Sequence, residues 1–182
     1  MGKSLLKGCI FGGIIVFAWM IVSWTVLPWH CWSLKGIENQ SAVSEALVNN
    51  TSEDGIYVIP SFCGAEWDEM GEKVAEMEKG PFVFMSLKRY GHGPNTGTFV
   101  ISFIFQLIGA LGITFLILKT KGLNYFSKVG LVTLIGFLIG FLGELPYWNW
   151  WGFSFGFVFV ELLDMVIAWF LAGLVIAAVA KE

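Results

Sequence analysis

The sequence predicts an all-α membrane protein with four transmembrane helices and a small α+β extracytoplasmic insert between the first and the second. Three observations predict this class. Hydrophobic residues make up 56% of the 182 residues, and charged residues make up only 14%, whereas ordinary soluble domains carry about 25% charged residues. Four stretches are apolar over the roughly 20 residues that a helix needs to cross a bilayer core about 30 Å thick. They lie at residues 8–28, 98–118, 129–148 and 153–180.

The first span belongs to residues 1–28 and is expected to stay attached as an anchor. Lys3 and Lys7 precede its apolar run, which ends in "VLPWHCW" without the small-residue cleavage site of a signal peptide. Cys9 precedes the apolar run instead of following it, so the segment does not have the order of a lipoprotein signal.

Residues 29–97 are predicted to form a small α+β cap. The stretch "AVSEALVNN" has the pattern of a short amphipathic helix, and "EWDEMGEKVAEMEKG" has that of a second helix. The stretches "GIYVIPSF" and "PFVFMSLKRY" are typical of strands. The cap is therefore expected to run helix, strand, helix, strand before residues 98–182 return to the membrane as the second to fourth spans.

The distribution of lysines predicts the direction of the spans. Lysine and arginine favour the cytoplasmic side of short loops. The short loop around 145–152 has none, whereas lysines flank the opposite ends of the spans at positions 3, 7, 119, 121, 128 and 181. Both termini are therefore expected in the cytoplasm, and residues 29–97 outside it.

Several polar side chains are predicted at one depth near the outer end of the spans. Counting about 1.5 Å per residue outward from the nearest cytoplasmic lysine places Glu144, Glu161 and Asp164 in the outer half of the bilayer, with Gln106 slightly deeper. His30 follows the first span and reaches the same level. Charged groups inside spans are functional candidates. We predict a polar cluster of these five residues; the alternative is that the glutamates sit among wet headgroups while Asp164 pairs locally.

Two aromatic segments are predicted to meet above this cluster. "LPWHCW" and "LPYWNWW" each end an outward-going span. Tryptophan and tyrosine suit the membrane boundary, so an aromatic belt is one interpretation. Because proline frees backbone carbonyls that line a cavity more readily than they face lipid, we favour a ligand groove or lid. Its predicted wall consists of Trp29, Trp32, Tyr147, Trp148, Trp150 and Trp151.

Small residues and cysteines supply two further predictions. Gly136, Gly140 and Gly143 form a close-packing surface on the third span, either for a neighbouring helix or for another subunit. Cys31 and Cys63 both fall outside the cytoplasm, where a disulfide is permitted, and two free thiols are the alternative. No closely spaced ligand motif predicts a metal site, and no cofactor is predicted.

Five segments together resemble a widespread bacterial family of small, functionally uncharacterised four-span inner-membrane proteins. The segments are "SWTVLPWH", "GIYVIP", "GPFVFMSLKR", "LPYWNWWGF" and "DMVIAWFLAGLVIA". The resemblance implies a bacterial inner membrane, four spans and an extracytoplasmic insert. It implies no activity, cofactor or catalytic residue.

These patterns favour a non-enzymatic integral inner-membrane protein. A net charge of −3, the absence of a basic stripe and the absence of a phosphate-binding glycine loop exclude nucleic acid as a partner. The expected partners are the lipid bilayer, other membrane subunits of a larger complex, or a bound lipid or quinone-like molecule in the aromatic groove. The alternative is a proton-coupled transporter or membrane enzyme that uses the acidic cluster, although no sequence motif marks an activated nucleophile.

Overall fold

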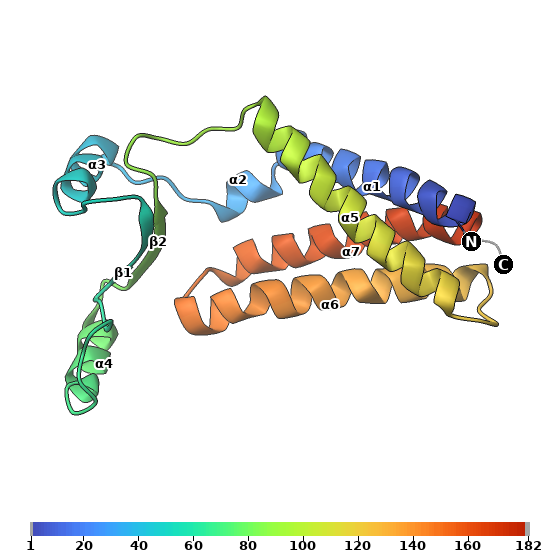
Figure 1. Ribbon diagram of the computed structural model, residues 1–182. Coiled ribbons are helices and arrows are strands. Elements are labelled where there is room, and N and C mark those ends of the chain that lie inside the picture. Colours follow the sequence, from blue (N-terminus) through green and yellow to red (C-terminus); the bar gives the residue numbers. More distant parts are fainter. Residues whose placement is uncertain (1, 181–182) are drawn as a thin grey trace. The chain divides into compact units, whose positions relative to one another are not determined.

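A computed structural model of the protein describes residues 2–180, which form two compact units (Figure 1). The membrane unit comprises the described residues up to Lys35 and from Pro94 onward, and the insert comprises Gly36–Gly93. The expected combination of apolar helices and a small α+β insert is confirmed. The insert is shorter than the predicted 29–97, because the residues just after the first span belong to the membrane unit.

Four helices in the membrane unit are long and apolar enough to cross a bilayer, and they lie where the four spans were expected. They run α1 Gly2–Thr25, α5 Thr96–Lys119, α6 Tyr125–Trp151 and α7 Phe155–Val179. A short helix, α2 (Trp29–Ser33), follows α1. The start of α1 and the end of α7 lie at the same end of the unit, as an even number of spans requires (Figure 1).

Three of these helices begin at a side chain that satisfies a free backbone N–H group. Asn95 accepts a hydrogen bond from the Thr98 N–H at the start of α5, and Asn124 accepts one from the Ser127 N–H at the start of α6. Ser154 accepts from the Phe157 N–H at the start of α7. Such caps fix the residue at which each helix begins, and they thereby define where the connections between the spans end.

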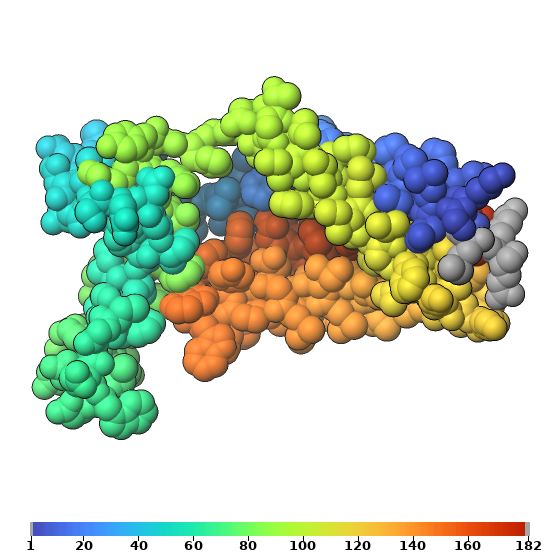
Figure 2. Space-filling view, viewed as in Figure 1, coloured from blue at the N-terminus to red at the C-terminus, as the bar shows by residue number. Residues whose placement is uncertain are grey.

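The core of the membrane unit lies around α7, which packs against α6 and against α1, while α5 packs mainly on α1. In the space-filling view, α5 and α6 both present long outer surfaces (Figure 2). Ten buried residues form the centre of the core: Val16, Ala110, Ile113, Ile117, Val132, Ala168, Trp169, Ala172, Ile176 and Ala180.

Two of the three glycines singled out on α6 lie at its contact with α7. A Cβ atom added at Gly136 would lie 2.8 Å from the carbonyl oxygen of Met165, and one added at Gly140 would lie 3.2 Å from the Cα atom of Leu162. Gly143 has nothing within 4 Å of that position. The close approach of α6 and α7 therefore depends on Gly136 and Gly140, and Gly143 lies outside it.

The prolines of the two aromatic segments have different effects on their helices. Helix α1 ends at Thr25, before Pro28, but α6 continues through Pro146 to Trp151. Proline removes one N–H donor and crowds the preceding turn, yet the helix ends only at Gly152, whose φ of 69° is a left-handed conformation that suits glycine. The third span is therefore longer than the predicted 129–148.

The insert contains the four predicted elements in the predicted order. They are α3 (Gln40–Asn49), β1 (Gly55–Ile59), α4 (Met70–Lys79) and β2 (Val83–Leu87). The strands pair antiparallel, with Gly55 opposite Leu87 and Ile59 opposite Val83. Prolines at positions 60 and 81 lie just outside the strands at the same end of the strand pair, where no ladder hydrogen bond is lost.

At the other end of this strand pair, Asp54 connects the chain before β1 to the chain after β2. Its carboxylate accepts hydrogen bonds from the backbone N–H of Arg89 at 3.0 Å and from Nζ of Lys88 at 3.1 Å. The Arg89 guanidinium in turn donates to the carbonyl oxygens of Ser52 and Val48. The Arg89 backbone hydrogen bond, followed by the Lys88 contacts, holds the pKa of Asp54 below its usual value.

Acid is therefore expected to loosen this end of the strand pair. Because the pKa of Asp54 is lower in the folded chain, its contribution to stability is complete above the pKa of the unfolded chain, about 3.9, and is lost as the pH falls through the folded-state value. The protection factor of the Arg89 amide against hydrogen exchange should fall at acid pH in the wild type. It should already be low at neutral pH in Asp54→Ala, and equal protection in the two proteins at neutral pH would contradict this role.

Candidate functional site

A buried group of polar side chains connects the end of α1, the short helix α2 and the middle of α7. We call Ser23, His30, Glu161 and Asp164 the polar cluster. Pro28 turns the chain after α1, and α2 then brings His30 against α7, where Glu161 and Asp164 lie one turn apart. Ser23 and Asp164 are 0% exposed and His30 is 2% exposed. These polar groups are therefore enclosed by protein.

Asp164 is the acceptor at the centre of the cluster. Its Oδ1 atom accepts a hydrogen bond from Nε1 of Trp19 at 2.9 Å. Its Oδ2 atom accepts from Oγ of Ser23 at 2.8 Å and lies 3.0 Å from Nε2 of His30. Hydrogen bonds from several donors favour the ionised carboxylate. Asp164 therefore serves as a buried anion that joins α1, α2 and α7.

His30 is held on all sides by groups that suit a positive charge. Its Nε2 atom contacts Asp164, and its Nδ1 atom lies 3.5 Å from Oε1 of Glu161. The ring of Trp24 stacks on the imidazole with centroids 3.8 Å apart and planes 13° apart. The face of an indole ring attracts a cation. Two carboxylates and one ring face therefore surround the histidine.

Ser23 stands beside a histidine, but the geometry does not activate it as a nucleophile. Its Oγ atom lies 3.0 Å from Nε2 of His30, a distance typical of a serine and its general base. However, Ser23 donates its hydrogen to Asp164 and accepts one from Nε1 of Trp29. A fully buried hydroxyl whose proton is committed to a carboxylate does not favour hydrolytic chemistry.

The structure brings three of the five predicted cluster residues together. His30, Glu161 and Asp164 are in contact. Glu144 is half-buried on α6 and lies close enough to Glu161 for the two carboxylates to repel each other. Gln106 lies instead in a separate groove of about 500 Å³ between α1 and α5, which Trp24 also lines. The amide is therefore not beneath the carboxylates.

Sequence reasoning missed two members of the hydrogen-bond network, Trp19 and Ser23. Both bond to Asp164 from α1. They are four residues apart and so share one helix face. Two residues with polar groups on one helix face, near the level of His30, could have indicated the network. Neither residue is charged, however, and each is common in apolar helices.

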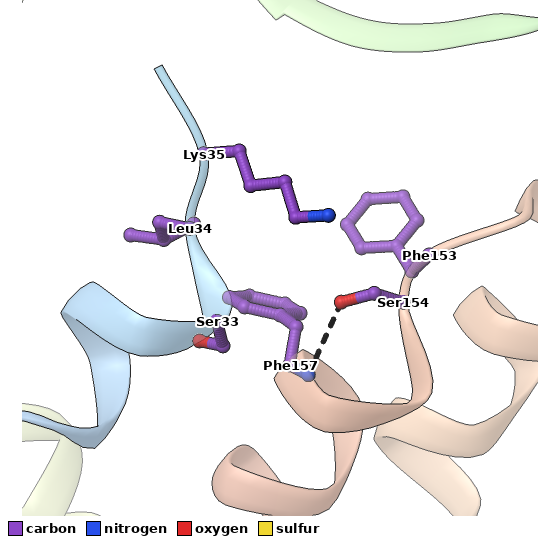
Figure 3. A pocket seen from close by; sticks show the side chains of 6 residues that line it. All are labelled: Ser33, Leu34, Lys35, Phe153, Ser154 and Phe157. Atoms are coloured by element: carbon purple, nitrogen blue, oxygen red, sulfur yellow. Dashed lines mark hydrogen bonds between the residues drawn. The ribbon is translucent and has the colours of Figure 1, made fainter.

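A groove opens between the end of α2 and the start of α7. We call it the α2–α7 groove; its volume is about 320 Å³ and its walls are Ser33, Leu34, Lys35, Phe153, Ser154 and Phe157. Figure 3 shows the Lys35 side chain extending toward Phe153, with the Phe157 ring drawn between the side chains of Ser33 and Ser154. The groove thus combines two aromatic rings with one ammonium group.

The six aromatic residues predicted to line a groove occupy other positions. Trp29 is half-buried and bonds to Ser23. Tyr147 packs against Phe153, and Trp148 packs against Phe155. Trp151 is half-buried, whereas Trp32 and Trp150 are 77% and 75% exposed. Groove residues lie next to the two segments instead: Ser33 directly follows the first, and Phe153 follows the second after Gly152.

The cysteines and carboxylates give no structural sign of a cross-link or metal. Cys31 and Cys63 are free thiols that belong to different units, so a disulfide between them stays a prediction. Within residues 2–180, no three histidine, cysteine, aspartate or glutamate side chains are grouped so as to hold a metal ion.

Comparison with known proteins gave no match to a protein-family model, to a curated protein or to a solved structure.

Proposed function

We propose that this chain is a non-enzymatic integral membrane protein that binds an anionic amphiphile in the α2–α7 groove. The observation that carries the proposal is the position of Lys35 at a groove lined by Leu34, Phe153 and Phe157. A ligand with an anionic head and an apolar tail satisfies both parts of this wall. A phospholipid headgroup or a fatty-acid carboxylate has this chemistry.

Charge supports an anionic ligand. Within residues 2–180, no carboxylate lies within ion-pair distance of Lys35, whereas Lys73 and Lys88 each pair with an acid. The groove also lies at the first turn of α7, where the helix dipole favours negative charge. Both features attract the same kind of headgroup.

Size supports an amphiphile that is only partly enclosed. The volume of about 320 Å³ lies at the lower end of the usual range for ligand sites, about 300–1,000 Å³. A headgroup and the first part of a chain fit such a volume, and the rest of the chain would extend into the bilayer. With both termini in the cytoplasm of a bacterial cell, as the lysines predict, the groove would open at the outer boundary of the inner membrane.

The contacts beneath the polar cluster count against the transporter alternative. Val16, Ala168 and Ala172 are buried and apolar where α1 and α7 continue toward the other end of the unit. A transported proton needs polar groups or water along its path. The polar cluster is better suited to local binding than to passage across the membrane.

Assembly with other membrane subunits is a second candidate, because several glycines lie open on the helices. Gly112, Gly130 and Gly143 have no neighbour within 4 Å of an added Cβ atom. Small residues on exposed helix faces allow close approach of another helix. This role would use other surfaces than the α2–α7 groove.

Replacing Lys35 by glutamine is expected to weaken binding of an anionic lipid about tenfold or more. Loss of a charged hydrogen-bond partner costs about 1.5–3 kcal/mol, and about 1.4 kcal/mol corresponds to tenfold in affinity. Native mass spectrometry in an uncharged detergent, with phosphatidylglycerol or phosphatidylcholine added, measures the bound fraction of each lipid.

Lys121→Gln is the matched control, because Lys121 is an exposed lysine of the same unit on the α5–α6 connection. It should bind phosphatidylglycerol as the wild type does. Equal affinity of the wild type for the two lipids, or equal loss in the two variants, would contradict the proposed site.

A further inference from the structure

We propose that His30 and Glu161 form a proton-binding site that takes up one proton from solution and thereby keeps α2 docked on α7. The site lies outside the α2–α7 groove, and proton uptake does not depend on what the groove binds. Four observations carry the inference.

The first observation fixes one proton of the histidine. The Nε2 atom of His30 lies 3.0 Å from Oδ2 of Asp164. The Asp164 carboxylate already accepts from Trp19 and Ser23, so it acts as an acceptor throughout. A nitrogen at hydrogen-bond distance from an ionised carboxylate oxygen must carry the hydrogen. Nε2 is therefore protonated, and Nδ1 bears a lone pair whenever the ring is neutral.

The second observation is a contact between two buried acceptors. Nδ1 of His30 lies 3.5 Å from Oε1 of Glu161, and within the described part of the chain neither atom has a hydrogen-bond partner. A lone pair that faces an ionised carboxylate oxygen is repulsive and leaves both atoms unsatisfied, which costs free energy in a buried place. One added proton between the two atoms converts this contact into a charge-assisted hydrogen bond.

The third observation is the charge of every element that faces the imidazole. Helix α7 presents Glu161 and Asp164, and α6 places Glu144 near Glu161. Helix α1 presents only the uncharged Ser23 and the ring face of Trp24. Proton uptake changes the formal charge of His30, Glu161 and Asp164 together from minus two to minus one. The groups that face the imidazole therefore carry either a negative charge or none.

The fourth observation gives the proton a route. The Glu161 side chain is 15% exposed, whereas those of His30 and Asp164 are 3% and 0% exposed. A proton from water first binds a carboxylate oxygen of Glu161. As the N–H bond forms at Nδ1, the O–H bond of Glu161 breaks, which leaves an imidazolium between two carboxylates.

The carbonyl of His30 links this site to the wall of the α2–α7 groove. It accepts hydrogen bonds from the Ser33 hydroxyl at 2.9 Å and from the Leu34 N–H at 3.0 Å. The positions of Ser33 and Leu34, and with them that of the adjacent Lys35, therefore follow the docking of His30. This link to ligand binding rests on the proposed function, whereas proton uptake does not.

The test uses the fact that the chain has only two histidines, His30 and His92. Nitrogen-15 labelling of histidine gives four ring signals, whose positions report which nitrogens carry protons. In detergent without added lipid, the wild type should keep Nε2 of His30 protonated between about pH 5 and 8, the range in which histidines titrate, while Nδ1 gains one proton as the pH falls. In Glu161→Gln, the amide N–H₂ group donates to Nδ1, so His30 should stay neutral over the same range.

His92 lies in the insert and is the internal control, because its signals should be the same in both proteins. A neutral His30 that never gains the second proton in the wild type would overturn the proposal. So would a Glu161→Gln protein in which His30 gains it as in the wild type. If Glu161→Gln fails to fold, the nitrogen-15 signals of wild-type His30 test the proposal without the variant, because the proposal requires that only Nδ1 gains a proton.

Discussion

Replacing Asp164 by alanine is expected to lower the free energy of unfolding by about 2–5 kcal/mol. Three donors, Trp19 Nε1, Ser23 Oγ and His30 Nε2, would lose their acceptor. Hydrogen bonds inside membrane proteins contribute about 0.6–1.7 kcal/mol each, and a buried charge that loses its partner adds to this cost. Circular dichroism of the helices during unfolding in detergent measures the change.

Two variants make this result specific to the network. Asp164→Asn keeps one acceptor oxygen and should lie between the wild type and Asp164→Ala. Glu144→Gln changes a half-buried acid on the neighbouring helix α6 and should alter stability by no more than about 0.5 kcal/mol. Equal stability of Asp164→Ala and Glu144→Gln would show that the buried carboxylate does not hold the helices together.

Replacing Gly136 by leucine is expected to separate α6 from α7 and to destabilise the membrane unit by about 3 kcal/mol. Its Cβ atom would meet the backbone carbonyl of Met165 at 2.8 Å and the side chain of Trp169 at a similar distance. A backbone atom in the wall of a helix moves only with the helix itself. Excess volume in a packed core costs about 1–3 kcal/mol. Because leucine is much larger than glycine, its cost is expected at the upper end of that range.

Gly143→Leu is the matched control for this contact, because it lies on the same helix and has nothing within 4 Å of an added Cβ atom. Its free energy of unfolding in detergent should stay within about 0.5 kcal/mol of the wild type. If the two leucine variants were equally stable, the α6–α7 contact would not depend on the glycine at position 136.

The spans were predictable because a long apolar run in a membrane protein has few alternatives to forming a helix. The ends of the spans were less so. The third span was predicted to end at residue 148, but the helix continues to Trp151 and ends at Gly152, which adopts the left-handed conformation. The insert was predicted too long, because the docking of His30 on α7 assigns α2 to the membrane unit.

The polar cluster was predictable only in part. Counting residues along a helix gives the depth of a side chain, and His30, Glu161 and Asp164 were expected at one level for this reason. Depth does not give the direction around the helix axis. Gln106 has a suitable depth but faces a groove between α1 and α5. Trp19 and Ser23 carry no charge, so nothing distinguished them from the apolar residues around them.

The α2–α7 groove illustrates a similar limit. The two Leu-Pro-aromatic segments drew attention to the correct part of the chain, but the wall of the groove consists of the residues that follow them. Tryptophan side chains are large and were given the greatest weight. Two of the six predicted groove residues are more than 70% exposed, and the groove instead uses Phe153, Phe157 and the ammonium group of Lys35.

The most direct test of the central claim is native mass spectrometry of the protein extracted gently from its own membrane. A lone chain that carries one anionic amphiphile, and that loses it in Lys35→Gln but not in Lys121→Gln, is the predicted result. A stoichiometric protein partner without any bound small molecule would contradict ligand binding in the α2–α7 groove. It would instead favour an accessory subunit that uses the open glycines on its helices.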